Sequence, residues 1–160
     1  MRASVIQLKE LRYQKICVDL GKPLEELSSL EAEGFDYNGV NFQVRLESGP
    51  VAIGEAKESN VFHVRLGIIV NNESGKIAPY KIDMMAVGIF EVAETVDAAI
   101  RADLAMVNGA SIIYGAIRET VVNLTSRSVA GTSILPTMDF RDHSKNPQNS
   151  TVSSAKLAPI

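Results

Sequence analysis

Residues Asn108–Phe140 are the most informative part of the chain: NGASIIYGAIRETVVNLTSRSVAGTSILPTMDF. An Asn-Gly pair opens the stretch and breaks helices, so we expect a helix that starts after it and spans Ala110–Arg127. The first half of that helix, Ala110–Ile117, is apolar almost all round. Such a helix must be covered on every side. In a chain of 160 residues, we expect another subunit to supply part of the cover.

Four upstream segments alternate apolar and polar residues, as half-buried β-strands do. The expected strands are Val5–Asp19, Asn41–Ala56, Val61–Val70 and Pro79–Val92. Gly49-Pro50 interrupts the second one, which is typical of a bulge or an edge strand. Met84–Phe90 is apolar on both faces, so we expect it to be covered on both sides. Strands followed by helices predict an α+β fold with an antiparallel sheet.

The connecting segments are less regular. Gly21–Gly39 contains leucines at helix-like spacing among four glutamates, in Leu24–Glu33, and fits either a short helix or an irregular crossover. Asn71–Gly75 has the composition of a hairpin loop. Glu94–Val107 predicts a short helix with Thr95 as its N-cap. We expect one domain over residues 1–140 and a polar C-terminal tail over residues 141–160.

Composition excludes several classes of protein. The net charge is −3, and the 16 basic residues are scattered, so no nucleic-acid-binding patch is expected. Cys17 is the single cysteine, which rules out a disulfide within the chain. Charged residues interrupt Met1–Leu20, and no apolar run reaches the length of a membrane span. These features predict a soluble cytoplasmic protein that is not inserted in a membrane.

The sequence offers little for catalysis. His63 falls on the polar side of an expected strand and His143 in the tail, so both are interpreted as solvated. Cys17 has no nucleophile motif around it, and the four glutamates of Leu24–Glu33 are typical of a solvated acidic face. Recognisable phosphate-binding, metal-binding and serine-hydrolase motifs are absent from the sequence. We therefore expect a protein that is not an enzyme and has no catalytic, cofactor or metal site.

The order of motifs in the chain resembles the SecB family of protein-export chaperones. That family carries an Asn, an apolar stretch with an aromatic residue, an Arg-Glu pair, a helix ending in Arg, and an exit of the form Leu-x-Pro-x-x-Phe. The corresponding residues here are Asn108, Ile112-Ile113-Tyr114, Arg118-Glu119, Leu124–Arg127 and Leu135–Phe140. Val87–Val92 looks like the Gly-Ile-Phe ending of the family's last strand. The resemblance covers residues from Val5 to Phe140.

The resemblance implies a four-stranded antiparallel sheet with the long helix packed on one face. It implies a homodimer or a dimer of dimers, with an interface that includes Ile112, Ile113, Tyr114, Ile117 and Val121. It also implies ATP-independent binding of non-native polypeptide clients, without a cofactor. The apolar groove for these clients would lie at Phe42, Val44 and Leu46.

Some positions depart from the family pattern. Gly115 stands where the family has Pro after the aromatic residue, and Ser128–Gly131 replaces a Gly-Gly pair. The segment after Phe140 has no counterpart of the amphipathic C-terminal helix. Of two acidic positions on the first strand implicated in docking to the SecA motor, one is Lys15, while Asp19 keeps the other. These departures weigh against export through SecA and leave the binding fold intact.

Several functions therefore remain open. The leading hypothesis is a SecB-like holdase for unfolded or precursor polypeptides. A narrower version is a dedicated chaperone of one partner, such as the antitoxin of a toxin–antitoxin system. An enzyme or small-molecule sensor on the same sheet would need polar groups that converge in a pocket, such as carboxylates near His63. In a purely structural oligomer, every apolar face would be buried.

Overall fold

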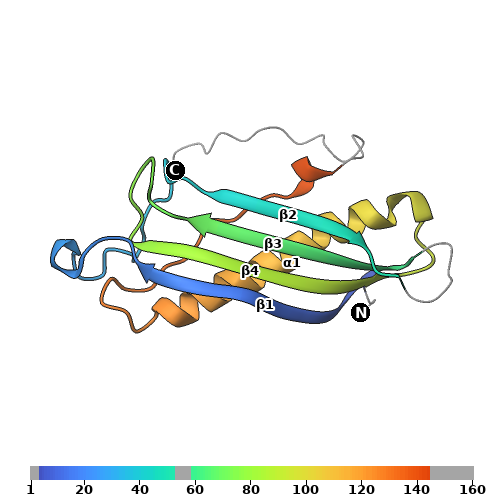
Figure 1. Cartoon of the computed structure of the whole chain (residues 1–160), viewed down its shortest axis with the longest axis horizontal. Helices are drawn as coiled ribbons and strands as arrows, with labels where there is room; N and C mark the ends of the chain where they lie inside the picture. Colours follow the sequence, from blue (N-terminus) through green and yellow to red (C-terminus); the bar gives the residue numbers. More distant parts are fainter. Residues whose placement is uncertain (1–3, 53–58, 145–160) are drawn as a thin grey trace.

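The computed structural model describes residues 4–52 and 59–144. Its elements, in chain order, are β1 (Ile6–Leu20), the 3-10 turn η1 (Leu24–Glu26), β2 (Gln43–Pro50), β3 (Val61–Val70), β4 (Tyr80–Val92), α1 (Ala98–Thr125) and the 3-10 turn η2 (Arg141–His143). The four strands form one antiparallel sheet in the order β1-β4-β3-β2, and α1 crosses one face of it (Figure 1). The predicted α+β architecture, with a long helix on one face of the sheet, is confirmed.

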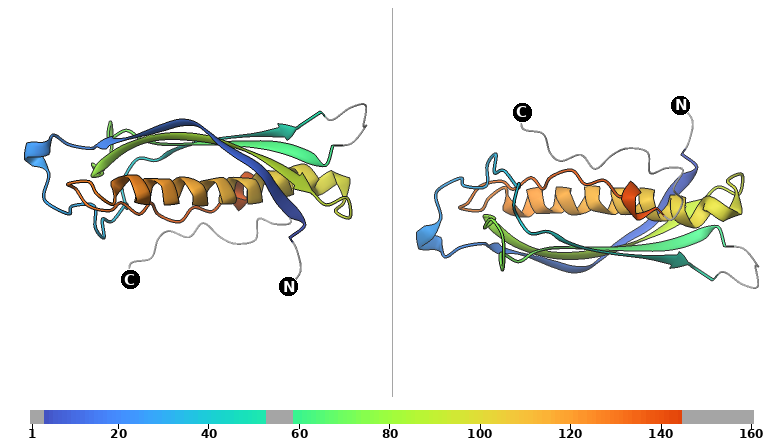
Figure 2. Two further views of the ribbon diagram at one scale, coloured as in Figure 1. Left: turned by 90° about the horizontal axis from the view of Figure 1, so that it is seen from below. Right: turned by 90° about the horizontal axis from the view of Figure 1, so that it is seen from above.

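The core lies between α1 and the inner face of the two central strands (Figure 2). The completely buried side chains there include Val64, Leu66, Ile68, Met84, Phe90, Ile113, Ile117 and Val121. The outer face carries Met85, Val87 and Ile89, which are half-buried, and no described element covers it (Figure 1). The prediction that Met84–Phe90 is covered on both sides is therefore wrong within the single chain.

The two helices expected on either side of Asn108-Gly109 are one continuous helix. Gly109 is buried against the sheet, where an added Cβ would lie 2.9 Å from both Phe90 Cε2 and Val64 Cγ2. The glycine permits this close approach, and packing outweighs its weak helix propensity, about 1 kcal/mol relative to Ala. The N-cap is Asp97, whose side chain accepts from the Ala99 amide at 3.0 Å. The prediction of Thr95 as N-cap was wrong.

The chain's own exit segment, Ser128–Phe140, covers α1 on the side that does not face the sheet. The Tyr114 hydroxyl donates to the Pro136 carbonyl at 2.6 Å, and Arg118 Nε donates to the Leu135 carbonyl at 2.9 Å. The rings of Tyr114 and Phe140 meet edge to face with centroids 5.8 Å apart. Within one chain, this segment supplies cover that the sequence had suggested would come from another subunit.

The crossover from Gly21 to Gly39 is irregular apart from η1, and it is tied to the exit segment. The Ala32 amide donates to the Ala130 carbonyl at 2.7 Å, and the hydroxyls of Tyr37 and Ser133 lie 2.5 Å apart. The predicted tail begins with the ordered turn η2, and Ser144 Oγ hydrogen-bonds to Asp103. Residues 145–160, and the predicted end of the second strand at Ala56, lie outside the described residues.

Candidate binding groove beside strand β2

Strand β2 lies at one edge of the sheet and leaves its inner face half-covered. Val44 pairs with Ile68 and Leu46 with Leu66, so both side chains point toward α1. Phe42 precedes them and packs on the ring of Tyr37, with centroids 5.6 Å apart. The sequence had placed Phe42, Val44 and Leu46 on one face; the pairing of β2 with β3 puts Val44 and Leu46 on the same face, and Phe42 lies just before the paired residues. All three are partly buried against the core, and their role in binding stays a prediction.

The same face of β2 continues past Leu46 with Ser48 and Pro50 and ends at a hollow of about 380 Å³. Its walls are Ser48, Gly49, Pro50 and Phe62 from the sheet and Ala99, Ala102, Asp103 and Met106 from α1. An adjoining hollow shares Pro50, Phe62, Ala99 and Ala102. The alanines leave room between helix and strand that a larger side chain would fill. We call the face from Phe42 to Pro50, together with this hollow, the β2 groove.

The lining of the β2 groove carries negative charge. Among the residues that the structure describes, the charged ones that line the two hollows are Asp97 and Asp103. Asp97 also caps α1 through the Ala99 amide, and Asp103 bonds with Ser144. The groove is therefore apolar along its floor and acidic at its helix side.

The opposite edge, β1, has a different surface. Leu8 and Ile16 point toward α1 yet are 40% and 50% exposed, and Leu124 of α1, which lies near Ile16, is 51% exposed. A hollow of about 440 Å³ lies here, lined by residues of β1, Tyr80 and the end of α1, including Ile16 and Leu124. One direct tie joins strand and helix, between the hydroxyls of Tyr13 and Thr120 at 2.7 Å.

Of the five residues expected at a subunit interface, only Ile112 presents surface, at 39% exposure. The other four, Ile113, Tyr114, Ile117 and Val121, are buried inside the single chain. They pack against the sheet or the exit segment, because the continuous helix turns them inward. Of these five residues, Ile112 is therefore the one that a second subunit could contact directly without a change in the packing of this chain.

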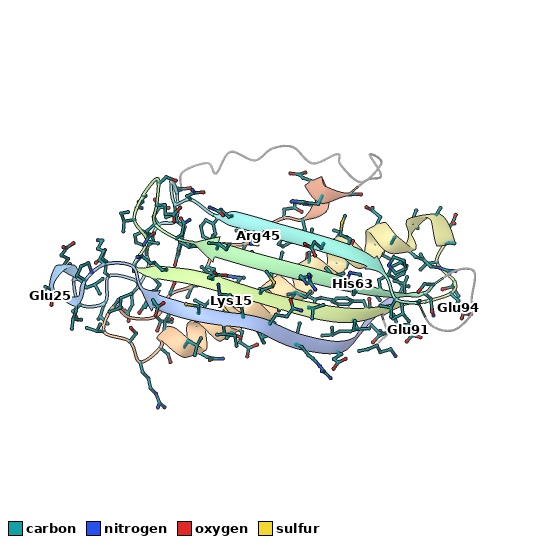
Figure 3. All side chains as sticks on the ribbon, in the orientation of Figure 1. Lys15, Glu25, Arg45, His63, Glu91 and Glu94 are labelled. Atoms are coloured by element: carbon teal, nitrogen blue, oxygen red, sulfur yellow. The ribbon has the colours of Figure 1, made fainter. Side chains whose placement is uncertain are left out.

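The outer face of the sheet carries the polar candidates. Lys15, Arg45 and His63 lie on this face, and Glu25 and Glu94 lie at opposite ends of the molecule (Figure 3). Cys17 Sγ donates to Asp19 at 3.2 Å, and this bond raises the pKa of the thiol. Across residues 4–52 and 59–144, no group of three or more His, Cys, Asp and Glu could hold a metal ion.

His63 does not join a carboxylate cluster. It lies across the backbone of Gly49, where an added Cβ would be 2.9 Å from His63 Cε1. Lys15 pairs with Asp83 and Arg65 with Glu47 across the strands, so these charges are engaged in cross-strand ion pairs. Among the described residues, no carboxylate is shown in contact with His63, which the enzyme or sensor alternative had required.

Sequence reasoning missed the helix half of the β2 groove. Ala99, Ala102 and Met106 were expected to belong to a short helix without a role. Their spacing places them along one face of α1, which is the available local signal. That the face looks onto β2 follows only from the packing of α1 across the sheet.

No model of a protein family matches the chain, and a search of curated proteins finds no match. Among solved structures, the chain is similar to a SecB-like chaperone of Mycobacterium tuberculosis, solved in complex with an antitoxin peptide. They share 15% identity over 84% of this chain and 88% of that one, with a TM-score of 0.48. A protein of unknown function from Streptococcus agalactiae shares 11% identity over 83% and 97% of the two chains, also at 0.48. Similarity at this level does not establish a family. Within the residues described, no helix is long and apolar enough to cross a membrane.

Proposed function

We propose that the protein is an ATP-independent, SecB-like chaperone that holds unfolded or precursor polypeptides in the β2 groove. The observation that supports this is the apolar face from Phe42 to Pro50, which α1 leaves half-covered beside an open hollow. Unfolded chains expose apolar side chains, and an apolar groove with an acidic rim suits their capture. The sequence motifs that resemble the SecB family favour the same function.

The free energies involved favour weak binding of a client at each single groove and tighter binding by an oligomer with several grooves. Burying one large apolar side chain contributes about 1.5–3 kcal/mol. Ordering a flexible client offsets much of that gain. Several grooves on one oligomer would hold a single client by avidity without any new contact. The proposal therefore includes a homodimer or a dimer of dimers.

The β1 side of α1 is the surface we propose for this assembly. Leu8, Ile16, Ile112 and Leu124 are large apolar residues that are each exposed by 39% or more. Leu8 and Ile16 lie on β1, at the opposite edge of the sheet from β2, and Leu124 lines a hollow with Ile16, so a second copy could cover this edge without closing the β2 groove.

A dedicated chaperone of one partner, such as an antitoxin, is the second candidate. It is favoured over export through SecA by the surroundings of Asp19, the position proposed for motor docking. Asp19 is opposite Lys81 in the sheet, and the nearby Lys15 pairs with Asp83. Two lysines and two carboxylates share this patch, so it makes little net negative surface. An Asp19→Asn variant that loses SecA binding in a pull-down would reinstate the export role; a pull-down that yields one protein would favour the dedicated role.

Aggregation assays test the main proposal. The purified protein should suppress aggregation of a refolding substrate, and the double variant Phe42→Ser, Leu46→Ser should lose suppression while keeping its circular dichroism. Gln43→Ser with Arg45→Ser, on the other face of the same strand, is the matched control and should keep it. No suppression by the unmodified protein at a stoichiometric amount of oligomer, with no detectable complex, would sink the proposal. Unfolding or dissociation of the first variant alone would favour the structural oligomer instead.

A further inference from the structure

The free backbone edge of β2 is defined by its pairing with β3. The Val51 amide donates to the Val61 carbonyl at 2.8 Å, so odd-numbered residues of β2 direct their amides and carbonyls toward β3. In an antiparallel ladder these groups alternate in direction along the strand. The even-numbered residues Val44, Leu46 and Ser48 therefore direct theirs away from the sheet. In the described chain, no backbone hydrogen bond outside the sheet reaches them.

Pro50 ends this free edge. It has the same parity as Ser48, but a proline has no amide hydrogen to donate. An added strand would find both a donor and an acceptor at Val44, Leu46 and Ser48 and only an acceptor at Pro50. An added strand can therefore pair fully with β2 only from Val44 to Ser48, and this pairing ends beside the hollow.

Backbone and side chains select the same client residues. Side chains directly opposite each other in an antiparallel pair lie on the same face. Client residues that bond with Val44, Leu46 and Ser48 would thus turn their side chains toward α1, and the one near Ser48 would meet the hollow between Pro50 and Ala102. Asp97 and Asp103 beside the hollow complement a positive charge next to that side chain.

We propose that a client segment adds to β2 as an extra strand opposite Val44–Ser48, and that it places one large apolar side chain, with a basic neighbour, in the hollow. Pro50 stops the pairing and so determines which client residue reaches the hollow. This inference rests on the proposed function and names the form in which a client binds. Strand addition supplies backbone hydrogen bonds that do not depend on client sequence, while the hollow supplies preference.

The first test uses a short synthetic peptide with one Phe between two Lys, labelled for fluorescence anisotropy with the full chain. Methylating the amides of alternate residues removes the donors that face β2 and should weaken binding about tenfold or more. Methylating the other set of amides should leave the affinity within about twofold. Replacing Phe by Ser, or both Lys by Glu, should each weaken binding. Equal affinities for the two methylated peptides would overturn strand addition, and an unchanged affinity of the Ser peptide would overturn the anchor role of the hollow.

Variants of the protein give the second test. Ser48→Pro removes an outward donor and no bond to β3, so it should weaken binding of the Phe peptide about tenfold, whereas Ser48→Ala should bind as before. Ala102→Leu fills the hollow and should also weaken it, whereas Ser111→Leu, at an exposed position elsewhere on α1, should not. Pro50→Ala restores a donor and should tighten binding of a longer peptide a few fold. Circular dichroism confirms that each variant is folded.

The two proposals fail in different ways. If the unmodified protein neither binds the Phe peptide nor suppresses aggregation, the proposed function is wrong. If it suppresses aggregation while Ser48→Pro binds the peptide as well as Ser48→Ala, only strand addition is wrong. If Pro50→Ala leaves affinity for the longer peptide unchanged, the stop at Pro50 is overturned.

Discussion

The two edges of the sheet are built differently. β1 has 15 residues and two register shifts against β4, one between Leu8 and Glu10 and one between Tyr13 and Lys15. β2 has 8 residues and pairs with β3 without a shift. Bulges and charged side chains protect an edge strand from pairing with another chain. Both edges carry charged side chains, and β2 also ends in Pro50, so the bulges are what distinguish them: they interrupt the outward backbone groups of β1, whereas those of β2 form one regular row up to Ser48.

The bulges also change which residues of β1 face the helix. Ile6 and Leu8 face α1 before the first shift, Leu11 and Tyr13 after it, and Ile16 after the second. The two shifts of one residue add up to two residues, which is one full period of a strand, so β1 begins and ends with the same parity facing α1. The difference between the edges suggests that irregular pairing lets a long strand twist around α1, while regular pairing preserves a row of outward backbone groups.

The largest effect on stability is expected from a change that disturbs the close contact of α1 with the sheet, on which both edges depend. Gly109→Val would place carbon where a Cβ already lies 2.9 Å from Phe90 and Val64, so we expect the free energy of unfolding to fall by about 2–3 kcal/mol. Gly115 has no atom within 4 Å of an added Cβ, and Gly115→Ala should raise it by about 0.5–1 kcal/mol. Urea unfolding followed by circular dichroism measures both. Equal destabilisation by the two changes would contradict the packing argument.

A smaller effect separates the edges by function. Leu8→Ser with Ile16→Ser removes apolar surface on the β1 side, and we expect it to weaken self-association by about 2 kcal/mol, because each side chain is only half-covered in one chain. Sedimentation at several protein concentrations measures this. Peptide affinity per chain should not change. If the variant instead lost peptide binding while its oligomer stayed intact, the client site would lie at β1 and not at β2.

The exit segment is tied to α1 by Tyr114, and Tyr114→Phe removes its hydrogen bond to Pro136. We expect a loss of about 1 kcal/mol in the free energy of unfolding at neutral pH. Burial raises the pKa of the Tyr114 phenol above its ordinary value. The folded state therefore keeps this proton more tightly than the unfolded chain does, and its contribution is present below about pH 10 and lost as the pH rises further.

Unfolding curves at neutral pH and above about pH 10 test this. Tyr114→Phe should lose less stability on alkalinisation than the unmodified protein. Tyr37→Phe is the matched variant, since burial also raises the pKa of Tyr37. An alkaline loss that is identical in Tyr114→Phe and the unmodified protein would show that Tyr114 is not its source.

The smallest effect is expected on the outer face of the sheet, which we take to be a solvated surface near both edges. Lys15→Ala breaks an ion pair with Asp83 in which the lysine side chain is 54% exposed. Such pairs contribute about 0.5 kcal/mol or less, and salt screens them. Unfolding at low and high salt should give nearly equal stabilities for variant and unmodified protein, and both edges should keep their properties. A loss above about 1 kcal/mol would mean that this face is more than a solvated surface.

Much of the sheet could be predicted from the chain because alternation with a period of two leaves little choice. Val61–Val70 was predicted with the bounds that β3 has. The predicted helix break at Asn108-Gly109 was wrong. Glycine disfavours a helix locally, but here the close packing of α1 on Phe90 requires a residue without a side chain. For the β2 groove, the shared face of Val44 and Leu46 was predictable from their spacing. The hollow was not, because the spacing of Ala99, Ala102 and Met106 shows that they share a helix face but not that this face looks onto β2.

The sequence by itself determined which residues form strands and which of them share a face, since that depends on neighbours along the chain. It also marked Tyr114, Arg118 and Leu135-Pro136 as parts of one pattern, without showing that Tyr114 donates to the Pro136 carbonyl and Arg118 to the Leu135 carbonyl. Only the tertiary structure decided that the exit segment covers α1 and that β2 is a regular edge with a hollow beside it. These properties depend on contacts between segments far apart in the chain, where alternative pairings satisfy the same local pattern.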